Sequence, residues 1–403
     1  MIELFVAREP KDFRKSGIVS LHIGEKRRTL NVTANREKEA PSAMKETRKA
    51  EWGIVVDRVI GILVLVAGIL FAAGLCVASP RGDNPIPSIF DPHSTPAQSI
   101  YHLSMFTLVI TGLIFLVVAT LLIYAVVKFR DRGANDKREP AQVYGSTQIE
   151  LAWTVIPVLI VVVLFLATAR VIHAIQDARN PLTAVQVTAI GHQFWWEFRY
   201  PALGIVTANE LHVPVSDPAH PTPTFLRLLS ADTDHSFWVP QLAGKTDLIP
   251  NRVNETWIDP HQTGIFLGQC AQYCGTQHAK MLLRVSVDTP EEFDAWVQAQ
   301  KQDTNQDTNQ DTRVIAGRHV FETNACINCH AIAGTNATGR FGPDLTHLMS
   351  RHTVAAGAAE NTPANLRLWI QNPDAIKPGS LMPAMQLSDV DLDALVRYLE
   401  TLQ

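Results

Sequence analysis

Three long apolar runs dominate the pattern of hydrophobic and polar positions along the chain. They occupy residues 59–78, 103–127 and 151–169, and none of them contains a charged residue. A helix needs about 20 apolar residues to cross the hydrocarbon layer of a bilayer. The pattern therefore predicts membrane-spanning helices, with the second and third runs forming a transmembrane hairpin over residues 95–172.

The first apolar run follows the basic stretch MKETRK at residues 44–49 and ends in small residues. This arrangement is typical of a secretory signal over residues 59–79, with an additional membrane helix as the alternative. If the run is a signal, residues 1–58 are an N-terminal extension that the mature protein lacks, and Met44 is a candidate for the true start. Cys76 is a candidate for lipidation, but the bulky residue before it fits a lipoprotein cleavage site poorly.

A short basic loop separates the second run from the third. It contains Lys128, Arg130, Arg132, Lys137 and Arg138. Loops rich in lysine and arginine stay on the cytoplasmic side of a membrane. The outer ends of the hairpin, and everything from about residue 172 onward, are therefore expected on the outer face, which is periplasmic in a Gram-negative cell.

Residues 182–288 carry short alternating or β-branched runs, such as TAVQVTAI, FLRLLSA and LLRVSVD, separated by proline, glycine and aspartate. This spacing is typical of an all-β sandwich or barrel. Residues 289–312 begin as a helix with start signals at Thr289 and end in the polar repeat QDTNQDTNQDT. The repeat over residues 302–312 has no apolar residue to bury, so we expect a flexible tether.

The last part of the chain, residues 313–403, has a helix-forming pattern and ends in an amphipathic helix capped by Ser388. We expect a separate small all-α domain.

The composition of the chain agrees with this organisation, since 403 residues suit two or three domains and an apolar content of 46% suits a membrane protein. The net charge of -4 gives no nucleic-acid footprint, so no nucleic-acid partner is expected.

The string CINCH at residues 326–330 lies in this last domain. Its spacing lets the thiols of Cys326 and Cys329, on one helical turn, add to the two vinyl groups of a haem, while His330 supplies an iron ligand. The alternative is a chance pair or half of a zinc site, but no further cysteine follows. The motif therefore predicts one covalently bound haem c.

A sixth iron ligand is expected downstream, where LMPAM at residues 381–385 offers Met382 or Met385. We prefer Met382, because the proline after it cannot continue a helix and holds the loop against the haem. Met349 is a more remote alternative. The string FGPDL resembles the proline turn of class I cytochromes c, which implies that the carbonyl of Pro343 braces the proximal histidine.

The string QCAQYCGTQHAKM at residues 269–281 gathers soft or borderline metal ligands: Cys270, Cys274, His278 and Met281. Ligands of this kind select copper or zinc. A zinc site would need one more histidine, but the thioether argues against zinc. His235, in SADTDHSFWVPQL, is the obvious distant partner. The full set suits two coppers bridged by both sulfurs, each with one histidine.

CAQYCGTQHAKM and DHSFWVP together resemble the binuclear CuA centre of subunit II of haem-copper cytochrome c oxidases, in the variety with a fused cytochrome c domain. The resemblance implies a cupredoxin-like CuA domain over residues 182–288 and a class I cytochrome c domain over residues 313–403. Gln272 stands where many members have a glutamate that also reaches a magnesium ion, which leaves that contact open. The implied copper ligands are Cys270 and Cys274 as bridges, His235 and His278 as caps, Met281 as the weak ligand and Gln272 through its carbonyl.

Two further segments resemble the family. STQIELAWTVIP resembles the start of its second transmembrane helix, which implies that Glu150 admits protons to subunit I; a helix-start acid that complements the macrodipole is the alternative. GHQFWWEFRY resembles the aromatic cluster through which electrons enter, although Phe194 stands where tryptophan is common. Packing around the coppers is the safer role for Phe194, Trp195 and Trp196.

The resemblance implies subunit II of a respiratory terminal oxidase in a bacterial inner membrane. Electrons would pass from cytochrome c or an upstream respiratory complex, through the haem and two copper ions, to subunit I, which reduces oxygen and pumps protons; subunit III is a further expected partner. The alternative is the corresponding subunit of a CuA-containing nitric oxide reductase. A copper or zinc module without electron transfer is disfavoured by CINCH, and a quinol-oxidising homologue is disfavoured because Cys270 and Cys274 are retained.

Overall fold

The computed structural model describes residues 87–130, 145–176, 184–217, 221–302 and 311–403. The N-terminal extension, the first apolar run, Met44 and Cys76 lie outside the described residues. So do most of the basic loop between the helices and most of the polar repeat. All described residues belong to one compact unit of the chain.

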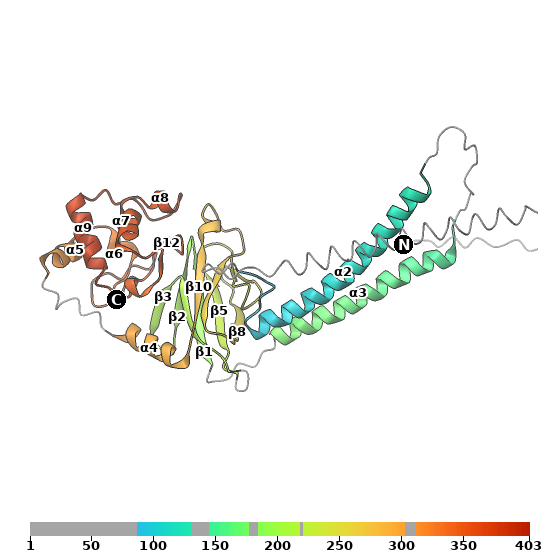
Figure 1. Ribbon diagram of the computed structural model, residues 1–403. Coiled ribbons are helices and arrows are strands. Elements are labelled where there is room, and N and C mark those ends of the chain that lie inside the picture. Colours follow the sequence, from blue (N-terminus) through green and yellow to red (C-terminus); the bar gives the residue numbers. More distant parts are fainter. Residues whose placement is uncertain (1–86, 131–144, 177–183, 218–220, 303–310) are drawn as a thin grey trace, which may run out of the picture. The chain divides into compact units, whose positions relative to one another are not determined.

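Two long helices, α2 (Thr95–Lys128) and α3 (Thr147–Gln176), lie side by side (Figure 1). Both are long and apolar enough to cross a membrane, and most of their large apolar side chains are exposed, as they are on helices that face lipid. The helices extend beyond the apolar runs that predicted them. On α2 the extension reaches Thr95 and Pro96, because proline fits the first turn, where its missing N–H costs nothing.

Among the described residues, ten strands form the domain that follows the helices. Their bounds are β1 Val185–His192, β2 Trp195–Tyr200, β3 Ile205–Ala208, β4 Glu210–Pro214, β5 Thr224–Ser230, β6 His235–Trp238, β7 Thr246–Leu248, β8 Asn254–Ile258, β9 Gly264–Cys270 and β10 Leu282–Asp288. One sheet has the order β3-β2-β1-β5-β8 and the other has the order β4-β10-β9-β6-β7. The β1–β5 and β4–β10 pairs are parallel and the other pairs are antiparallel. Of the sandwich and the barrel that the pattern allowed, the structure is the sandwich.

The two sheets share one apolar core. The side chains of Leu226, Phe237 and Val285 are completely buried in it, and the alternating burial along β10 shows which face of that strand points inward. Helix α4 (Pro290–Lys301) packs on the same core and begins with a capping box between Thr289 and Glu292. Close packing of this kind fixes the strand ends that carry functional side chains.

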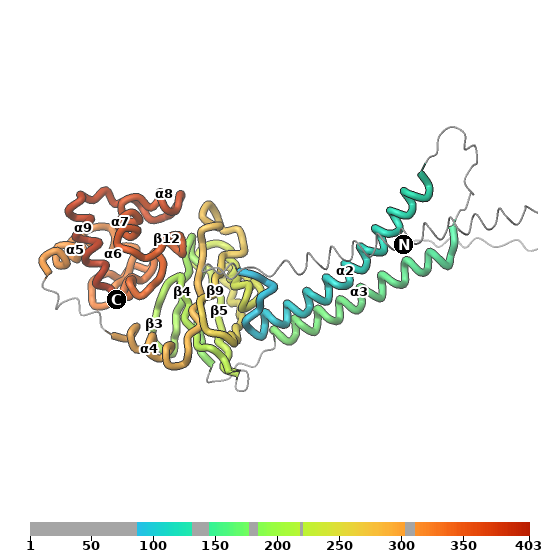
Figure 2. The backbone as a smooth tube through the Cα atoms, in the orientation of Figure 1, coloured from blue at the N-terminus to red at the C-terminus, as the bar shows by residue number. Residues whose placement is uncertain are grey.

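The C-terminal domain is helical (orange to red in Figure 2). Its elements are α5 Thr312–Thr323, α6 Cys326–Cys329, the 3₁₀ turn Leu348–Ser350, β11 Thr353–Val354, β12 Ala359–Glu360, α7 Pro363–Gln371, α8 Pro373–Ile376 and α9 Asp389–Leu399. Helices α5 and α9 cross so closely that a Cβ at Gly317 would lie 1.9 Å from the carbonyl oxygen of Ala394. Only glycine fits at this crossing.

The ends of the C-terminal helices largely follow their caps. Ser388 caps α9 as predicted, since its hydroxyl accepts the N–H of Asp391 at 3.1 Å. Helix α5 begins at Thr312, which the sequence pattern assigned to the tether. The difference has a local cause, because the Asp311 side chain accepts the N–H of Arg313 at 2.9 Å and so starts the helix early.

Candidate functional site

The predicted copper ligands come from two neighbouring strands and the loop after one of them. Strand β9 ends at Cys270, and β6 begins at His235 beside it, since Phe237 pairs with Cys270. The chain then turns through Cys274 and the short 3₁₀ helix His278–Lys280 into β10. Strand pairing thus joins His235 to a cluster that lies 35 residues further along the chain.

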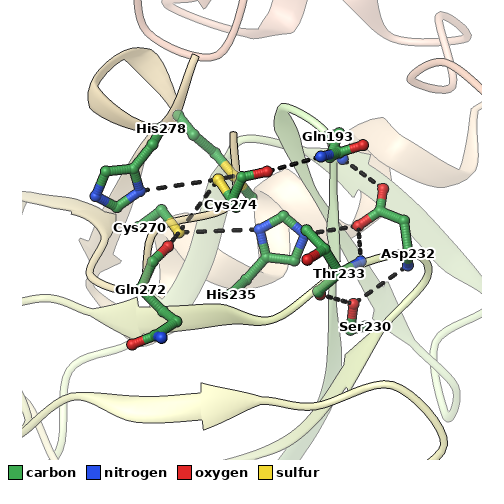
Figure 3. A network of polar contacts seen from close by, with 10 residues as sticks. Gln193, Ser230, Asp232, Thr233, His235, Cys270, Gln272, Cys274 and His278 are labelled. Atoms are coloured by element: carbon green, nitrogen blue, oxygen red, sulfur yellow. Dashed lines mark hydrogen bonds and ion pairs between the residues drawn. The ribbon is translucent and has the colours of Figure 1, made fainter. Parts of the chain in front are cut away.

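Figure 3 shows His235, Gln272 and His278 gathered around the sulfur atoms of Cys270 and Cys274. The Cys270 and Cys274 Sγ atoms are 3.9 Å apart. His235 Nδ1 lies 3.8 Å from Cys270 Sγ, and His278 Nδ1 lies 3.8 Å from Cys274 Sγ. Each sulfur thus has one imidazole nitrogen beside it, an arrangement of donors that suits soft or borderline metal ions.

The two remaining predicted ligands complete the cluster. The carbonyl oxygen of Gln272 lies 3.1 Å from Cys270 Sγ, and Met281 Sδ lies 3.9 Å from Cys274 Sγ. The cysteines and Met281 are buried and belong to the core of the sandwich. The cluster is therefore held by packed strands rather than by a free loop.

The electrostatics of the cluster favour loss of a proton from one thiol. The hydrogen bond between the thiols lowers the pKa of Cys270 to about 3, and the hydrogen bond with His235 acts in the same direction against burial. The same contact raises the pKa of Cys274. Thiolates are the form that binds metals, so a pair that readily loses one proton is suited to bind a metal ion, which would displace the second proton.

An aspartate fixes the orientation of His235. Asp232 Oδ1 lies 2.7 Å from His235 Nε2, and Asp232 also accepts the backbone N–H groups of Gln193 at 2.6 Å and Thr233 at 2.7 Å. Burial works against charge on His235, but these contacts with Asp232 and Cys270 outweigh it and raise the pKa of the imidazole. The carboxylate holds Nε2 and leaves Nδ1 facing Cys270.

A glycine makes room for the same ring. A Cβ on Gly191 would lie 2.8 Å from His235 Cδ2. No sequence pattern marks Gly191 or Asp232 as part of the site. The string DTDH holds two acids before His235, and nothing in it shows that Asp232 rather than Asp234 turns toward the imidazole.

The tryptophans of the predicted aromatic cluster, Trp195 and Trp196, lie in different environments. Trp196 is completely buried, donates from Nε1 to the carbonyl of Met281 at 3.4 Å, and lies in the sandwich core. Trp195 stacks on His192 with 4.2 Å between ring centroids. The packing role preferred from sequence fits Trp196 well, whereas Trp195 lies outside that core cluster.

Residues of the C-terminal domain line most of a largely apolar cavity, which Phe194 and Trp195 of the β-domain also line. Cys326, Cys329, His330, Met382 and Met385 are among its lining residues. Met349 packs against the core of the domain and is not among the lining residues. The choice between Met382 and Met385 stays a prediction.

The proximal side of the cavity is built around His330. Its Nδ1 lies 2.7 Å from the carbonyl oxygen of Pro343, which leaves Nε2 as the possible iron ligand. Burial lowers the pKa of His330 and so favours the neutral, ligating form. A Cβ on Gly342 would lie 2.6 Å from His330 Cε1, so the ring packs directly on the backbone.

The donors around the cavity fit a haem. The buried guanidinium of Arg351 lines it, and its Nε has no hydrogen-bond partner among the described residues. A carboxylate of the haem would satisfy that nitrogen. The other predicted site residue, Glu150, lies in the first turn of α3, and its role in proton uptake stays a prediction.

The fold and the two cysteine clusters define a class of protein: a membrane-anchored chain that joins a cupredoxin-like sandwich to a helical cytochrome c domain. Family models match three segments in this order. They are the transmembrane domain of cytochrome c oxidase subunit II over residues 84–171, the periplasmic domain of that subunit over residues 219–287, and cytochrome c over residues 314–403.

Named relatives agree with this class. Cytochrome c oxidase subunit 2 of Alkalihalophilus pseudofirmus is 35% identical over 318 residues, covering 78% of this chain and 90% of that protein. Its counterpart in Bacillus subtilis is 29% identical over 364 residues, covering 86% and 98%. A crystal structure of the periplasmic domain of subunit II of cytochrome oxidase of Bradyrhizobium japonicum is 31% identical, covers 30% of this chain and 96% of its own, and has a TM-score of 0.28.

This chain belongs to the family of cytochrome c oxidase subunit II, in its form with a C-terminal cytochrome c domain. It is therefore a subunit of a terminal oxidase, associated with a membrane and with subunit I. The family implies copper in the β-domain and haem c in the C-terminal domain. The recognition and the fold class predicted from sequence are confirmed.

Proposed function

We propose that the chain accepts electrons through a haem c and relays them through a binuclear CuA centre to the haem of subunit I, where oxygen is reduced and protons are pumped. Cys326, Cys329, His330 and Met382 would hold the haem. The coppers would be held by His235, Cys270, Gln272, Cys274, His278 and Met281. When bound, each cofactor supplies a site that takes up and gives back single electrons.

One observation carries this proposal. Two buried sulfur atoms lie 3.9 Å apart and each has an imidazole nitrogen at 3.8 Å, and the same chain has an apolar cavity lined by the CINCH cysteines. A closed zinc site needs four ligands around one ion. Here Met281 and the carbonyl of Gln272 lie beside the sulfurs as well. A donor set of this size supports a pair of metal ions rather than one.

The residues of the chain contribute rigidity. The sandwich core holds the cysteines, and Asp232 and Gly191 set the position of His235. A site that cannot rearrange changes little when its charge changes by one electron, so little reorganisation opposes transfer. In the cytochrome domain, the Pro343 carbonyl fixes the position of His330 in the same way that Asp232 fixes His235.

The membrane part completes the proposal. We take α2 and α3 as a two-helix anchor in a bacterial inner membrane, with both redox domains on the outer, periplasmic face. Glu150 would admit protons to subunit I from its position at the start of α3. Cytochrome c or an upstream respiratory complex would be the donor, and subunit III a further partner.

The test is metal analysis with optical and EPR spectra of the purified protein. The proposal expects two coppers per chain, a mixed-valence two-copper EPR signal and a haem c band. Replacing Cys274 by serine should abolish the two-copper signal and leave the haem band, while Cys329→Ser should disturb only the haem. Stoichiometric zinc in place of copper would overturn the proposal.

A further inference from the structure

The β-domain and the cytochrome domain meet through polar groups that are buried. Glu210, at the start of β4, is only 2% exposed. Its carboxylate accepts the backbone N–H groups of His352 and Thr353 and the Thr353 hydroxyl, each at 2.9 Å. A buried carboxylate is strongly disfavoured without such donors, and bonds to an ionised acceptor are the stronger kind. The cytochrome domain therefore provides the groups that stabilise Glu210 in its buried position.

A lysine makes the reciprocal contact. Lys377, just after α8, is 4% exposed. Its Nζ donates to the carbonyl of Phe194 in the β-domain at 2.7 Å and to the carbonyl of Ala355 at 3.3 Å. Burial lowers the pKa of Lys377 to about 7, which reflects how well the contact excludes water. Each domain thus buries one long ionisable side chain against backbone groups of the other.

The same face of the cytochrome domain touches the loop that carries the predicted copper ligands. Lys280 Nζ donates to the carbonyl of Ile376 at 2.8 Å, and Gln277 Nε2 donates to the carbonyl of Pro378. The N–H of Leu282 donates to the carbonyl of Ala356 at 3.2 Å. Backbone carbonyls of the cytochrome domain therefore accept hydrogen bonds from several donors of the β-domain. A domain held only by a flexible tether would not make such a matched set of hydrogen bonds.

The apolar part of this contact lies at Trp195. The indole is 8% exposed and forms a small buried cluster with Ala208 of the β-domain and Ala356 of the cytochrome domain. Phe194 and Trp195 also line the cavity that Cys326 and Met382 line. The cavity for the haem therefore opens toward Phe194 and Trp195, at the start of β2.

We propose that the surface around Glu210 and Trp195 is a specific docking site for the cytochrome domain of the same chain, and that Glu210 and Lys377 are the positioning residues that hold its cavity against Trp195. The docking itself follows from these contacts, and its purpose rests on the proposed relay. Because the cytochrome domain covers Trp195, a soluble donor would reach the haem domain and not this indole.

Hydrogen exchange of the assembled oxidase, read by mass spectrometry on peptides covering residues 350–356, tests the docking. Glu210→Gln and Lys377→Met should each speed exchange of the His352 and Thr353 amides at least tenfold. The matched controls Glu255→Gln and Lys245→Met alter exposed residues of the same types on the β-domain and should leave exchange unchanged. Thr353→Val removes only one hydroxyl donor, and it replaces Glu210→Gln or Lys377→Met where the loss of a charged group prevents folding.

Unchanged exchange in Glu210→Gln, Lys377→Met and Thr353→Val, with haem and copper content intact, would overturn the docking. A second readout tests positioning: transfer from reduced haem to the β-domain should slow at least tenfold in the first two variants. Rapid transfer despite lost protection would overturn the positioning role. If the His352 and Thr353 amides were protected in wild-type protein that binds no copper, the docking would be supported and the proposed relay would be overturned. Failure of the docking and failure of the relay are therefore distinguishable.

Discussion

Gly191→Ala should displace His235, and the size of the displacement can be worked from the contacts. The new Cβ would lie 2.8 Å from His235 Cδ2 and 2.9 Å from Cγ. Carbon atoms in contact sit about 3.6 Å apart, so the ring must retreat by roughly 0.8 Å. Metal–ligand bonds tolerate only about 0.2 Å. The backbone of Gly191 is not in the left-handed region, so the clash is the main effect of the added methyl group.

The ring has little freedom to retreat. His235 is completely buried, and its other nitrogen is held by Asp232 at 2.7 Å. Overpacking of this kind costs about 1–3 kcal/mol in the free energy of unfolding. Mutation of a residue that orients a metal ligand lowers metal affinity by about 10–100-fold. We therefore expect both a less stable apo domain and weaker copper binding.

Copper titration with EPR measures the affinity, and urea unfolding of the copper-free protein measures the stability. Gly244→Ala is the control, because its Cβ would meet only the flexible tip of Ile100, at 3.0 Å. The control should bind copper normally. If Gly191→Ala bound two coppers with the same affinity and the same EPR signal as the wild type, the reasoning about His235 would be wrong.

Three further predictions concern the haem ligand, the core and the tether. Met382→Ala should lower the haem potential in a redox titration, because His/Met ligation raises it, whereas Met385→Ala should not; the reverse result would exchange the two assignments. Leu226→Ala should lower the free energy of unfolding by about 2–5 kcal/mol in urea, since Leu226 is completely buried, while truncating the exposed Val253 should change it little. Lengthening the polar repeat about fourfold should lower the effective concentration roughly eightfold and slow haem-to-copper transfer in stopped flow; rates unaffected by the insertion would count against a role for the tether.

Much of the fold could be predicted from sequence because its signals are local. The apolar runs gave both described membrane helices, and Ser388 marked the start of α9 through its own cap. The candidate copper and haem ligands could be listed because Cys270, Cys274 and the CINCH cysteines lie close together along the chain. Spacing within one turn or loop survives folding, so it can be read directly.

The missed residues act over long sequence distances. Glu210 meets Thr353 across 143 residues, and Lys377 meets Phe194 across 183. Neither residue has a neighbouring motif that marks it, and an isolated glutamate or lysine is most often a solvated surface residue. Gly191 was missed for a related reason, because only the packed structure brings the ring of His235 against its backbone.

The most direct test of the electron relay is time-resolved absorption of the intact subunit after rapid photoreduction of its haem. The account predicts that the haem c band decays at the same rate as the copper band changes, and that this coupled change disappears in Cys274→Ser while the haem is still reduced. A haem that stays reduced in the wild type, or a decay with no matching change at the copper, would contradict the account.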